Sequence, residues 1–264
     1  MDSPIFILST GRTGTRFFEE YINNTSGDTV CRHEPHPSRR FKFLSNLYLN
    51  NRIGDRRVAR IYLFSRKGLF KRIGNRTYVE SSNFIFGCIP ALNTHFDRVR
   101  IIHIVRDPVT YAQSHLNHGF WKGHKRFFAR HVPYWLEKLE VEDRSDPVQL
   151  LAARWNMVNR QIRTYAGTNP YLLVRFEELF SKDLGASSAK LNEIREFCGL
   201  SPLGEEENMS WLSHPKNISR GKRQLNEKEK ALILRNTKDL MQELSTDPST
   251  ASQSAGRKQI RNNG

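Results

Sequence analysis

Three runs of consecutive apolar residues stand out in the hydrophobic pattern of this chain. They span residues 4–10 (PIFILST), 99–105 (VRIIHIV) and 170–176 (PYLLVRF). A short apolar run without polar alternation is typical of a strand that is buried on both faces of a parallel sheet. Residues 28–32 and 77–80 have shorter strand-like patterns, so the sequence predicts five strands.

Between these strands, apolar residues recur at three- and four-residue spacing, which predicts helices. The predicted helices span residues 13–23, 39–72, 85–96, 108–118, 147–165, 187–198 and 226–244. Strands that alternate with helices fold into a mostly parallel sheet with helices on both faces. Ligands of such sheets bind at the carboxyl ends of the strands, so we expect the functional residues to follow residues 10, 32 and 105.

The length of 264 residues fits one α/β domain, which we place at residues 1–245. Residues 119–135 are aromatic, basic and irregular, and we interpret them as an insertion that could form a lid. Residues 246–264 are polar and rich in Ser, Thr and Asn, which predicts a disordered C-terminal tail.

The charge of the chain is unevenly distributed. The net charge is +15, and residues 39–76, a predicted helical insertion, hold twelve Lys or Arg residues against the single acid Asp55. A segment this basic attracts anions, such as nucleic acid, a membrane surface, a sulfated or phosphorylated ligand, or an acidic acceptor. A solvated helical face would have the same composition, so charge alone does not decide among these.

The sequence indicates a soluble chain of a reducing, cytoplasmic compartment. It contains no apolar stretch long enough to span a membrane, and its N-terminus runs from Met1 directly into the first strand without a basic leader or cleavage site. The three cysteines are widely spaced and form no CxxC pair, so no metal site is expected.

The first strand is followed by the sequence STGRTGTRFF. Glycines at positions 11 and 14 let the backbone turn tightly, and the first amides of the next helix then favour an anion. Thr13 and Thr15 add hydroxyl donors, while Arg12 and Arg16 add positive charge. The loop resembles a Walker A loop but lacks its lysine. An ordinary glycine-rich turn would leave these four side chains unexplained.

A second candidate anion site follows the strand at residues 99–105. Arg106 comes at the carboxyl end of this strand, and Ser114 lies two turns into the helix that Asp107 and Pro108 begin. A guanidinium fork and a hydroxyl can converge on the oxygens of one phosphate. Taken alone, the pattern is equally typical of a salt-bridged helix start, but together with the first loop it predicts two anion sites at one edge.

These two motifs together resemble the sulfotransferases that use 3′-phosphoadenosine-5′-phosphosulfate (PAPS). In that family, a loop of the form GRTGT holds the 5′-phosphosulfate, and an Arg followed eight residues later by Ser, as in Arg106 and Ser114, holds the 3′-phosphate. Residues 171–179 resemble a further segment of the family, and the likeness runs in order over residues 4–244. The resemblance implies a P-loop-like, three-layer α/β/α sandwich and transfer of a sulfuryl group to an acceptor.

The resemblance also implies which residues bind PAPS. They are Arg12, Thr13, Gly14, Thr15, Arg16, Phe17, Arg106 and Ser114, with Arg220, Gly221 and Lys222 in a late basic loop that resembles the one closing over the 3′-phosphate. An exposed basic turn would look the same as that late loop. Arg at position 12, where cytosolic small-molecule enzymes usually carry Lys, is closer to the carbohydrate, tyrosylprotein and bacterial branches. Either cation can neutralise charge on the leaving phosphate, so Arg12 is also a catalytic candidate.

Sulfuryl transfer needs a base that takes the proton of the acceptor hydroxyl. The second strand ends in Arg32-His33-Glu34-Pro35-His36. Glu34 follows Arg12 by 22 residues, much as a catalytic Glu follows the loop in tyrosylprotein and some bacterial sulfotransferases. Glu34 is therefore the first candidate for the base, and His33 or His36 is the second, because imidazole titrates near neutral pH. A polar strand end without catalytic role would have the same residues.

Two other functions compete with this one. A phosphoryl-transferring kinase on the same sheet is disfavoured by the missing Walker lysine and by the lack of an acidic strand end for Mg²⁺, whereas a sulfuryl donor needs no metal. A non-catalytic binder of nucleic acid or another polyanion would use residues 39–76. The positive charge of the chain predicts an anionic acceptor as the partner, such as a glycan, a peptide or a lipid-like molecule. Nucleic acid is disfavoured, peripheral membrane contact is compatible with the charge, and the oligomeric state is left open.

Overall fold

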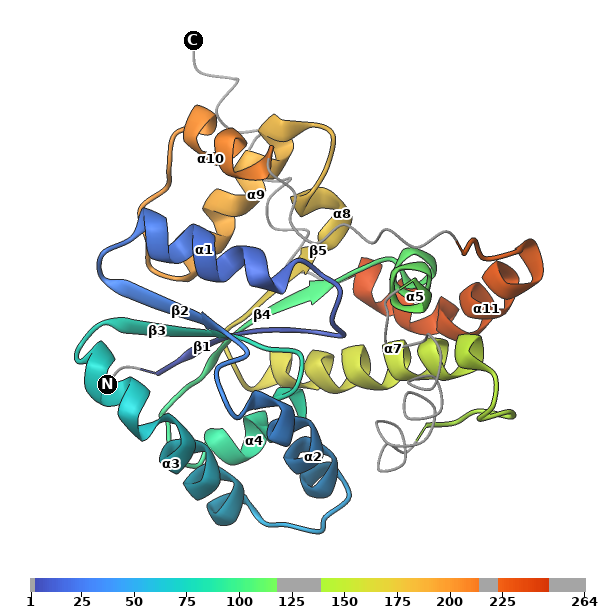
Figure 1. Ribbon diagram of the computed structural model, residues 1–264, viewed down its shortest axis with the longest axis horizontal. Coiled ribbons are helices and arrows are strands. Elements are labelled where there is room, and N and C mark those ends of the chain that lie inside the picture. The colour runs from blue at the N-terminus through green and yellow to red at the C-terminus, as the bar shows by residue number, and fades with distance from the viewer. Residues whose placement is uncertain (1–2, 118–138, 214–222, 247–264) are drawn as a thin grey trace.

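The computed structural model describes residues 3–117, 139–213 and 223–246. Its strands are β1 (Ile5–Ser9), β2 (Thr29–His33), β3 (Thr77–Ser81), β4 (Arg100–Val105) and β5 (Tyr171–Arg175). They form one sheet in the order β2-β3-β1-β4-β5, and all neighbouring pairs are parallel (Figure 1). The carboxyl ends of these five strands therefore lie at one edge of the sheet.

Helices cover both faces of this sheet, which confirms the predicted α/β sandwich (Figure 1). On one side lie α1 (Thr15–Thr25), α8 (Phe176–Leu179), α9 (Leu184–Phe197) and α10 (Glu205–Leu212); on the other lie α2 (Ser38–Leu49), α3 (Asp55–Ile73), α4 (Ile89–Leu92) and α7 (Pro147–Arg163). The helices α5 (Pro108–Leu116) and α11 (Glu227–Ser245) pack beside α7, and two short 3-10 turns span Phe86–Cys88 and Thr164–Gly167.

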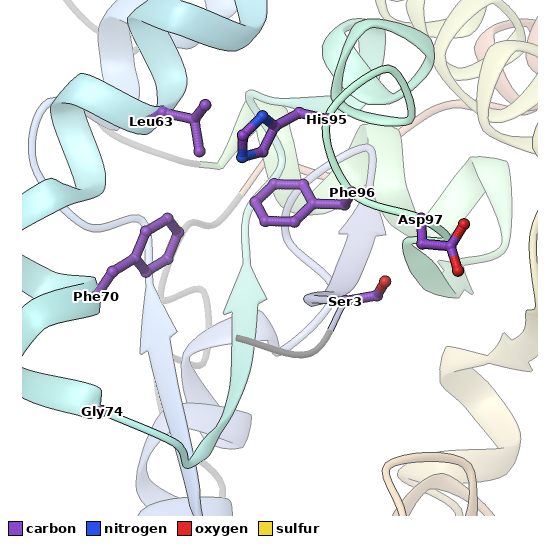
Figure 2. Close-up of a pocket in the computed structure, with 7 residues that line it drawn as sticks. All are labelled: Ser3, Leu63, Phe70, Gly74, His95, Phe96 and Asp97. Carbon is purple, nitrogen blue, oxygen red and sulfur yellow. The ribbon is translucent and has the colours of Figure 1, made fainter.

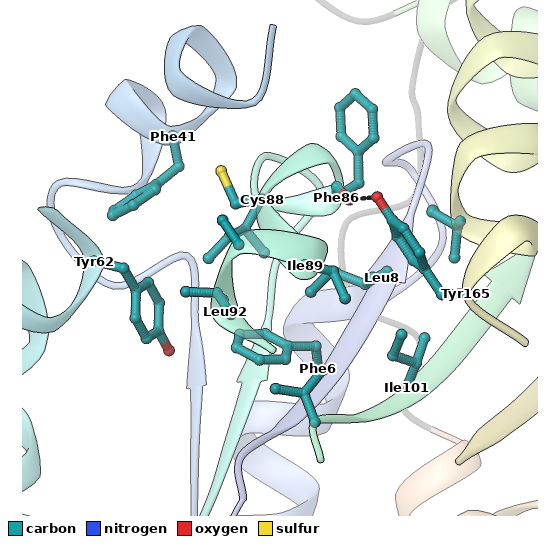
Figure 3. Packing of buried hydrophobic residues seen from close by; sticks show 14 of the residues in the cluster. Phe6, Leu8, Phe41, Tyr62, Phe86, Cys88, Ile89, Leu92, Ile101 and Tyr165 are labelled. Carbon is teal, nitrogen blue, oxygen red and sulfur yellow. Dashed lines mark hydrogen bonds between the residues drawn. The ribbon is translucent and has the colours of Figure 1, made fainter. Parts of the chain in front are cut away.

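Alternation along the central strand β1 supplies both cores. Successive strand residues point to opposite faces of a sheet. Phe6 and Leu8 enter the cluster beneath α2, α3 and α4 (Figure 3), while Ile5 and Ile7 enter the cluster beneath α1 and α9. All four side chains are fully buried, which explains why β1 reads as an unbroken apolar run.

The structure differs from the sequence prediction in several helices. The helix predicted at residues 85–96 is a 3-10 turn followed by the short α4, which ends at Leu92, and α8 was not predicted. The single helix predicted at residues 39–72 is two helices, because the chain turns between them through Asn51, whose φ is 56°, and Gly54. Helix α10 was not predicted, since its glutamate-rich first turn hides a weak apolar pattern. The predicted lid at 119–135 and the tail beyond residue 246 lie outside the described residues.

In the described part of the chain, no helix is both long enough and apolar enough to cross a membrane.

Candidate functional site

The loop between β1 and α1 turns through three residues in the left-handed region. Gly11 has φ 89°, Arg12 has φ 59° and Gly14 has φ 69°. A Cβ atom at Gly14 would lie 2.9 Å from Phe180 Cε2, and one at Gly11 would lie 2.6 Å from Asn83 Nδ2. The positive φ therefore favours glycine at both positions, and at position 14 the Phe180 ring also leaves little room for a side chain.

Helix α1 begins without the usual side-chain partners for its first amides. Its cap residue Gly14 offers no side-chain hydrogen bond, and its first turn contains no acid. The first N–H groups of any helix lack partners within the helix, and the helix dipole is positive at this end. This helix start is therefore suited to bind an anion such as a phosphate.

Arg12 joins the first and second predicted junctions. Its Nε donates to Ser114 Oγ at 3.2 Å, and its carbonyl oxygen accepts a hydrogen bond from Nη1 of Arg106 at 2.6 Å. Partial burial lowers the pKa of both guanidinium groups, but their ordinary value is so high that both stay charged at neutral pH. Two cations and a hydroxyl therefore meet at the carboxyl edge of β1 and β4.

The segment after β5 supports Arg106 from the other side. The guanidinium of Arg106 lies 4.4 Å above the ring of Phe176, and its Nε donates to Thr110 Oγ1 at 3.2 Å. Glu177 Oε1 accepts the backbone N–H of Asp107 at 3.0 Å. Phe176 and Glu177 belong to the family-like segment at residues 171–179, so this segment orients the end of β4.

Two residues of α7 hold the same loops and were not predicted as site residues. The buried Arg154 donates from Nη1 to the carbonyl oxygen of Thr10 at 3.0 Å and to the hydroxyl of Tyr111 at 3.3 Å. Trp155 donates from Nε1 to the carbonyl oxygen of Arg106 at 2.8 Å. Arg154 could have been noticed in the sequence, because it lies on the apolar face of a predicted helix. An arginine at such a position needs a buried hydrogen-bond partner, but the sequence does not identify that partner.

Two predicted nucleotide-binding side chains point into the protein instead. The hydroxyl of Thr13 is buried and donates to Ser9 Oγ at 2.7 Å, which closes the loop from inside. Phe17 is only 8% exposed and stacks on Tyr21 at 5.3 Å between ring centroids, while its N–H donates to Gly14 O. Thr13 therefore turns its hydroxyl inward, and Phe17 packs in the core because α1 turns that face towards the sheet. Their role in nucleotide binding stays a prediction.

The remaining loop residues take different positions. Arg16 is exposed, and its Nε lies 4.0 Å from Glu20 Oε1, one turn further along the helix. Thr15 is buried, and its carbonyl oxygen accepts a hydrogen bond from Ser81 Oγ at 2.9 Å. The exposed Arg16 can therefore meet a ligand from solvent, whereas Thr15 connects the loop to β3.

Ser81 also connects the third predicted junction to this loop. Its carbonyl oxygen accepts the backbone N–H of Glu34 at 3.0 Å, while its side chain holds Thr15. Ser81 is the register partner of both Ile7 in β1 and His33 in β2. Glu34 therefore lies at the same edge as the Arg12 loop, separated from it by one strand.

The electrostatic environment of Glu34 is that of a partly buried acid. Burial raises the pKa of its carboxyl group to about 7, although the charge of Arg39 opposes the shift. Burial also lowers the pKa of His33, and the nearby charge of Arg16 acts in the same direction, against the influence of Glu19 and the Ser81 backbone. At neutral pH, both groups are therefore able to accept a proton.

The adjacent Glu80 is not part of the open site. Its carboxylate is fully buried, where it receives Nη2 of Arg66 at 2.8 Å and Nε at 3.0 Å, and the hydroxyl of Tyr78 at 2.7 Å. Nη1 of Arg66 also donates to the carbonyl oxygen of His36 at 3.2 Å. The ion pair therefore fixes the loop that follows Glu34 to the sheet.

The late basic loop is described only at its end. Arg220, Gly221 and Lys222 lie outside the described residues. The next residue, Arg223, donates its N–H to Asn117 Oδ1 at 3.1 Å, and its carbonyl oxygen accepts the Asn117 amide at 2.9 Å. The chain therefore leaves this loop at helix α5, the helix that bears Ser114.

Two cavities of about 540 and 630 Å³ lie away from this edge. The first is bordered by Ser3, Gly74 and Asp97, which precede β1, β3 and β4, and Figure 2 shows Leu63, Phe70 and His95 around it. This cavity is therefore at the amino ends of the strands. Among the described residues, no group of three His, Cys, Asp or Glu side chains could hold a metal ion.

Comparison with known proteins identifies the family of the chain and agrees with its fold. A family model described as "Sulfotransferase family" matches residues 4–203. A sulfotransferase of Alicyclobacillus acidocaldarius superposes with a TM-score of 0.56 and 14% identity, over 94% of this chain and 97% of that chain. A sulfotransferase of Mycobacterium avium gives a TM-score of 0.58 and 13% identity, over 92% and 76%. No curated protein sequence matched the chain.

Proposed function

Because the chain belongs to the sulfotransferase family, we propose that it transfers the sulfuryl group of PAPS to a hydroxyl or amine of an acceptor molecule. One observation carries the proposal: Arg12 contacts both Ser114 and Arg106, so the loop after β1 and the end of β4 form one cationic site. A nucleotide that bears phosphate groups at both its 5′ and 3′ positions needs two such anion sites side by side.

The proposed binding mode divides the two phosphates between these elements. The amides at the start of α1, together with Arg12 and Arg16, bind the 5′-phosphosulfate. Arg106 and Ser114 bind the 3′-phosphate, and Arg220 and Lys222 of the late loop remain a prediction for the same phosphate. The anchor of Arg223 on α5 supports that prediction, since it brings the end of the late loop to the helix of Ser114.

The proposed reaction forms one sulfur–oxygen bond (or sulfur–nitrogen bond) and breaks another. Glu34 accepts the acceptor proton, the acceptor atom attacks sulfur, and the bond to the bridging oxygen of the donor breaks. Arg12 stabilises the negative charge that collects on the departing 5′-phosphate. His33 is the alternative base, because its lowered pKa keeps the imidazole neutral. The proposed reaction uses no metal ion.

Charge and cysteine content support a proposal for the acceptor and for the compartment in which the protein acts. The basic helices α2 and α3 follow directly after Glu34, so we propose an acceptor that is itself anionic, such as an acidic glycan, peptide or lipid-like molecule. Cys31, Cys88 and Cys198 are buried free thiols, which suits a reducing, cytoplasmic compartment.

A thermal-shift experiment tests the nucleotide assignment. Adenosine 3′,5′-bisphosphate, the product left by the donor, is expected to stabilise the protein by about 3 kcal/mol at a hundredfold excess over its Kd. Arg106→Ala is expected to weaken binding of this ligand much more than binding of adenosine 5′-phosphate. No shift at millimolar bisphosphate contradicts the proposed function, and equal loss for both ligands contradicts the role of Arg106.

The same strand provides a matched control. Arg100 begins β4 at the opposite edge and lies 5.3 Å above the ring of Phe197, much as Arg106 lies above Phe176. Arg100→Ala removes an arginine with the same kind of ring contact from the same strand. It is expected to leave the stabilisation by adenosine 3′,5′-bisphosphate unchanged.

A further inference from the structure

Helix α3 presents one continuous exposed stripe on its outer face. Phe64 is at its centre and is 81% exposed. The positions three, four and seven residues away on either side lie on the same face of a helix. They are Arg57, Arg60, Ile61, Lys67, Gly68 and Lys71, and each of them is exposed.

The chemistry of this stripe is cationic and apolar at the same time. Four of its residues are Arg or Lys, two are large apolar side chains, and it contains no acid. Within the described part of the chain, these four cations form no ion pair. The stripe therefore carries an unneutralised positive charge around two apolar side chains.

The opposite face of α3 is fixed rigidly to the sheet. Val58, Ala59 and Tyr62 are buried, and Arg66 forms the buried ion pair with Glu80. The stripe is therefore the outer surface of a packed helix, and Figure 1 shows α3 and α11 at opposite ends of the molecule. Beside it lies the cavity of about 630 Å³, which is bordered by Arg56, Arg60, Phe64 and Lys67.

We propose that this stripe docks the protein on the surface of an anionic lipid bilayer, with Phe64 and Ile61 entering the boundary between headgroups and acyl chains. The four cations then contact lipid phosphates, and the long Arg and Lys side chains reach the headgroups beside the inserted rings. Charge attraction or one inserted side chain alone gives weak, reversible binding, and the stripe combines both.

The central aromatic residue is what favours a bilayer over a soluble polyanion. A polyanion or an acidic protein surface is attracted by the four cations alone and needs no apolar residue between them. A single exposed apolar residue is ordinary on a protein surface, but here Phe64 and Ile61 occupy the middle of the stripe. An anionic bilayer binds the cationic and the apolar side chains at the same time, in one orientation of the helix.

Vesicle co-sedimentation of the full chain, without nucleotide, tests the proposal independently of sulfuryl transfer. The chain is expected to sediment with vesicles of phosphatidylcholine that contain about a third phosphatidylserine, and not with phosphatidylcholine alone. Arg60→Glu with Lys67→Glu is expected to weaken the binding at least about tenfold. Phe64→Ser is expected to weaken it by about tenfold as well.

Helix α11 supplies matched controls, because Lys228, Leu234 and Arg235 are exposed there. Lys228→Glu with Arg235→Glu makes the same charge change, Leu234→Ser makes the matching loss of apolar surface, and both are expected to bind within about twofold of the unchanged chain. Absence of binding to anionic vesicles overturns the proposal. So does an equal loss in the α11 controls, and so does unchanged binding of Phe64→Ser, which identifies a partner held by charge alone.

Discussion

Replacement of Glu34 by Gln separates the role of this residue in the reaction from its effect on the fold. Gln keeps the shape of the side chain but cannot ionise or accept a proton as a base. Turnover of PAPS with an acceptor is expected to fall by about 10² to 10⁴, the range for loss of a general base. Stabilisation by adenosine 3′,5′-bisphosphate is expected to persist, since Glu34 does not lie in the Arg12–Ser114–Arg106 contact.

The same replacement is expected to stabilise the protein at high pH. Burial raises the pKa of Glu34 from 4.5 to about 7, so the folded protein holds a proton that the unfolded chain has released. Stability is therefore lost as pH rises from about 4.5 to 7. A full shift is worth about 3 kcal/mol, and solvent screening of this partly buried group reduces it to about 1–2 kcal/mol. Glu34→Gln removes that loss.

Urea unfolding at pH 5 and pH 8 measures this effect. The variant is expected to exceed the unchanged protein by about 1–2 kcal/mol at pH 8 and by much less at pH 5. Glu140→Gln is the control, because its side chain is exposed. A stability difference that does not grow with pH refutes the burial of Glu34, and retained turnover assigns the base to His33 or elsewhere.

The buried pair and the loop give two further predictions. Arg66→Met leaves the Glu80 carboxylate buried without its cation, so the free energy of unfolding is expected to fall by about 3–5 kcal/mol in urea titrations. Adding Glu80→Gln to that variant is expected to restore much of the loss; no recovery would mean that Arg66 acts through packing. Gly14→Ala places a side chain at a left-handed position against Phe180, and it is expected to cost about 1–2 kcal/mol in thermal unfolding and to abolish the stabilisation by adenosine 3′,5′-bisphosphate. Unchanged binding of adenosine 3′,5′-bisphosphate by Gly14→Ala would contradict the proposal that this loop conformation binds the nucleotide.

The strands were predictable because β1, β4 and β5 are buried on both faces and read as apolar runs. The residues that follow them were predictable as a group, since parallel strands bring their carboxyl ends to one edge. The break between α2 and α3 was missed, although residues 50–55 (NNRIGD) contain four of the Asn, Gly and Asp residues that favour turns.

The site contacts of Arg154 and Trp155, which the sequence did not predict, are formed between parts of the chain that are distant in sequence. The sequence shows an arginine at position 154 but does not show which group it contacts. Its partner is the carbonyl oxygen of Thr10, which the packing of α7 against β1 brings within hydrogen-bond distance. Thr13 was expected to face a ligand because its type and position allow it. In the structure, the hydroxyl of Thr13 instead donates its hydrogen bond to the buried Ser9 Oγ at the end of β1.

The strand order places the proposed nucleotide site and the proposed acceptor site on different strands, so substitutions in one need not alter the other. The residues proposed to hold the nucleotide follow β1 and β4 in the middle of the sheet, whereas Glu34 follows β2 at its margin, and the basic helices come next in the chain. If the proposed roles hold, substitutions in residues 34–76 are expected to alter the choice of acceptor while the donor site keeps its shape. Ser81 is hydrogen-bonded to both halves, so a substitution of this serine is expected to disturb the donor side and the acceptor side together.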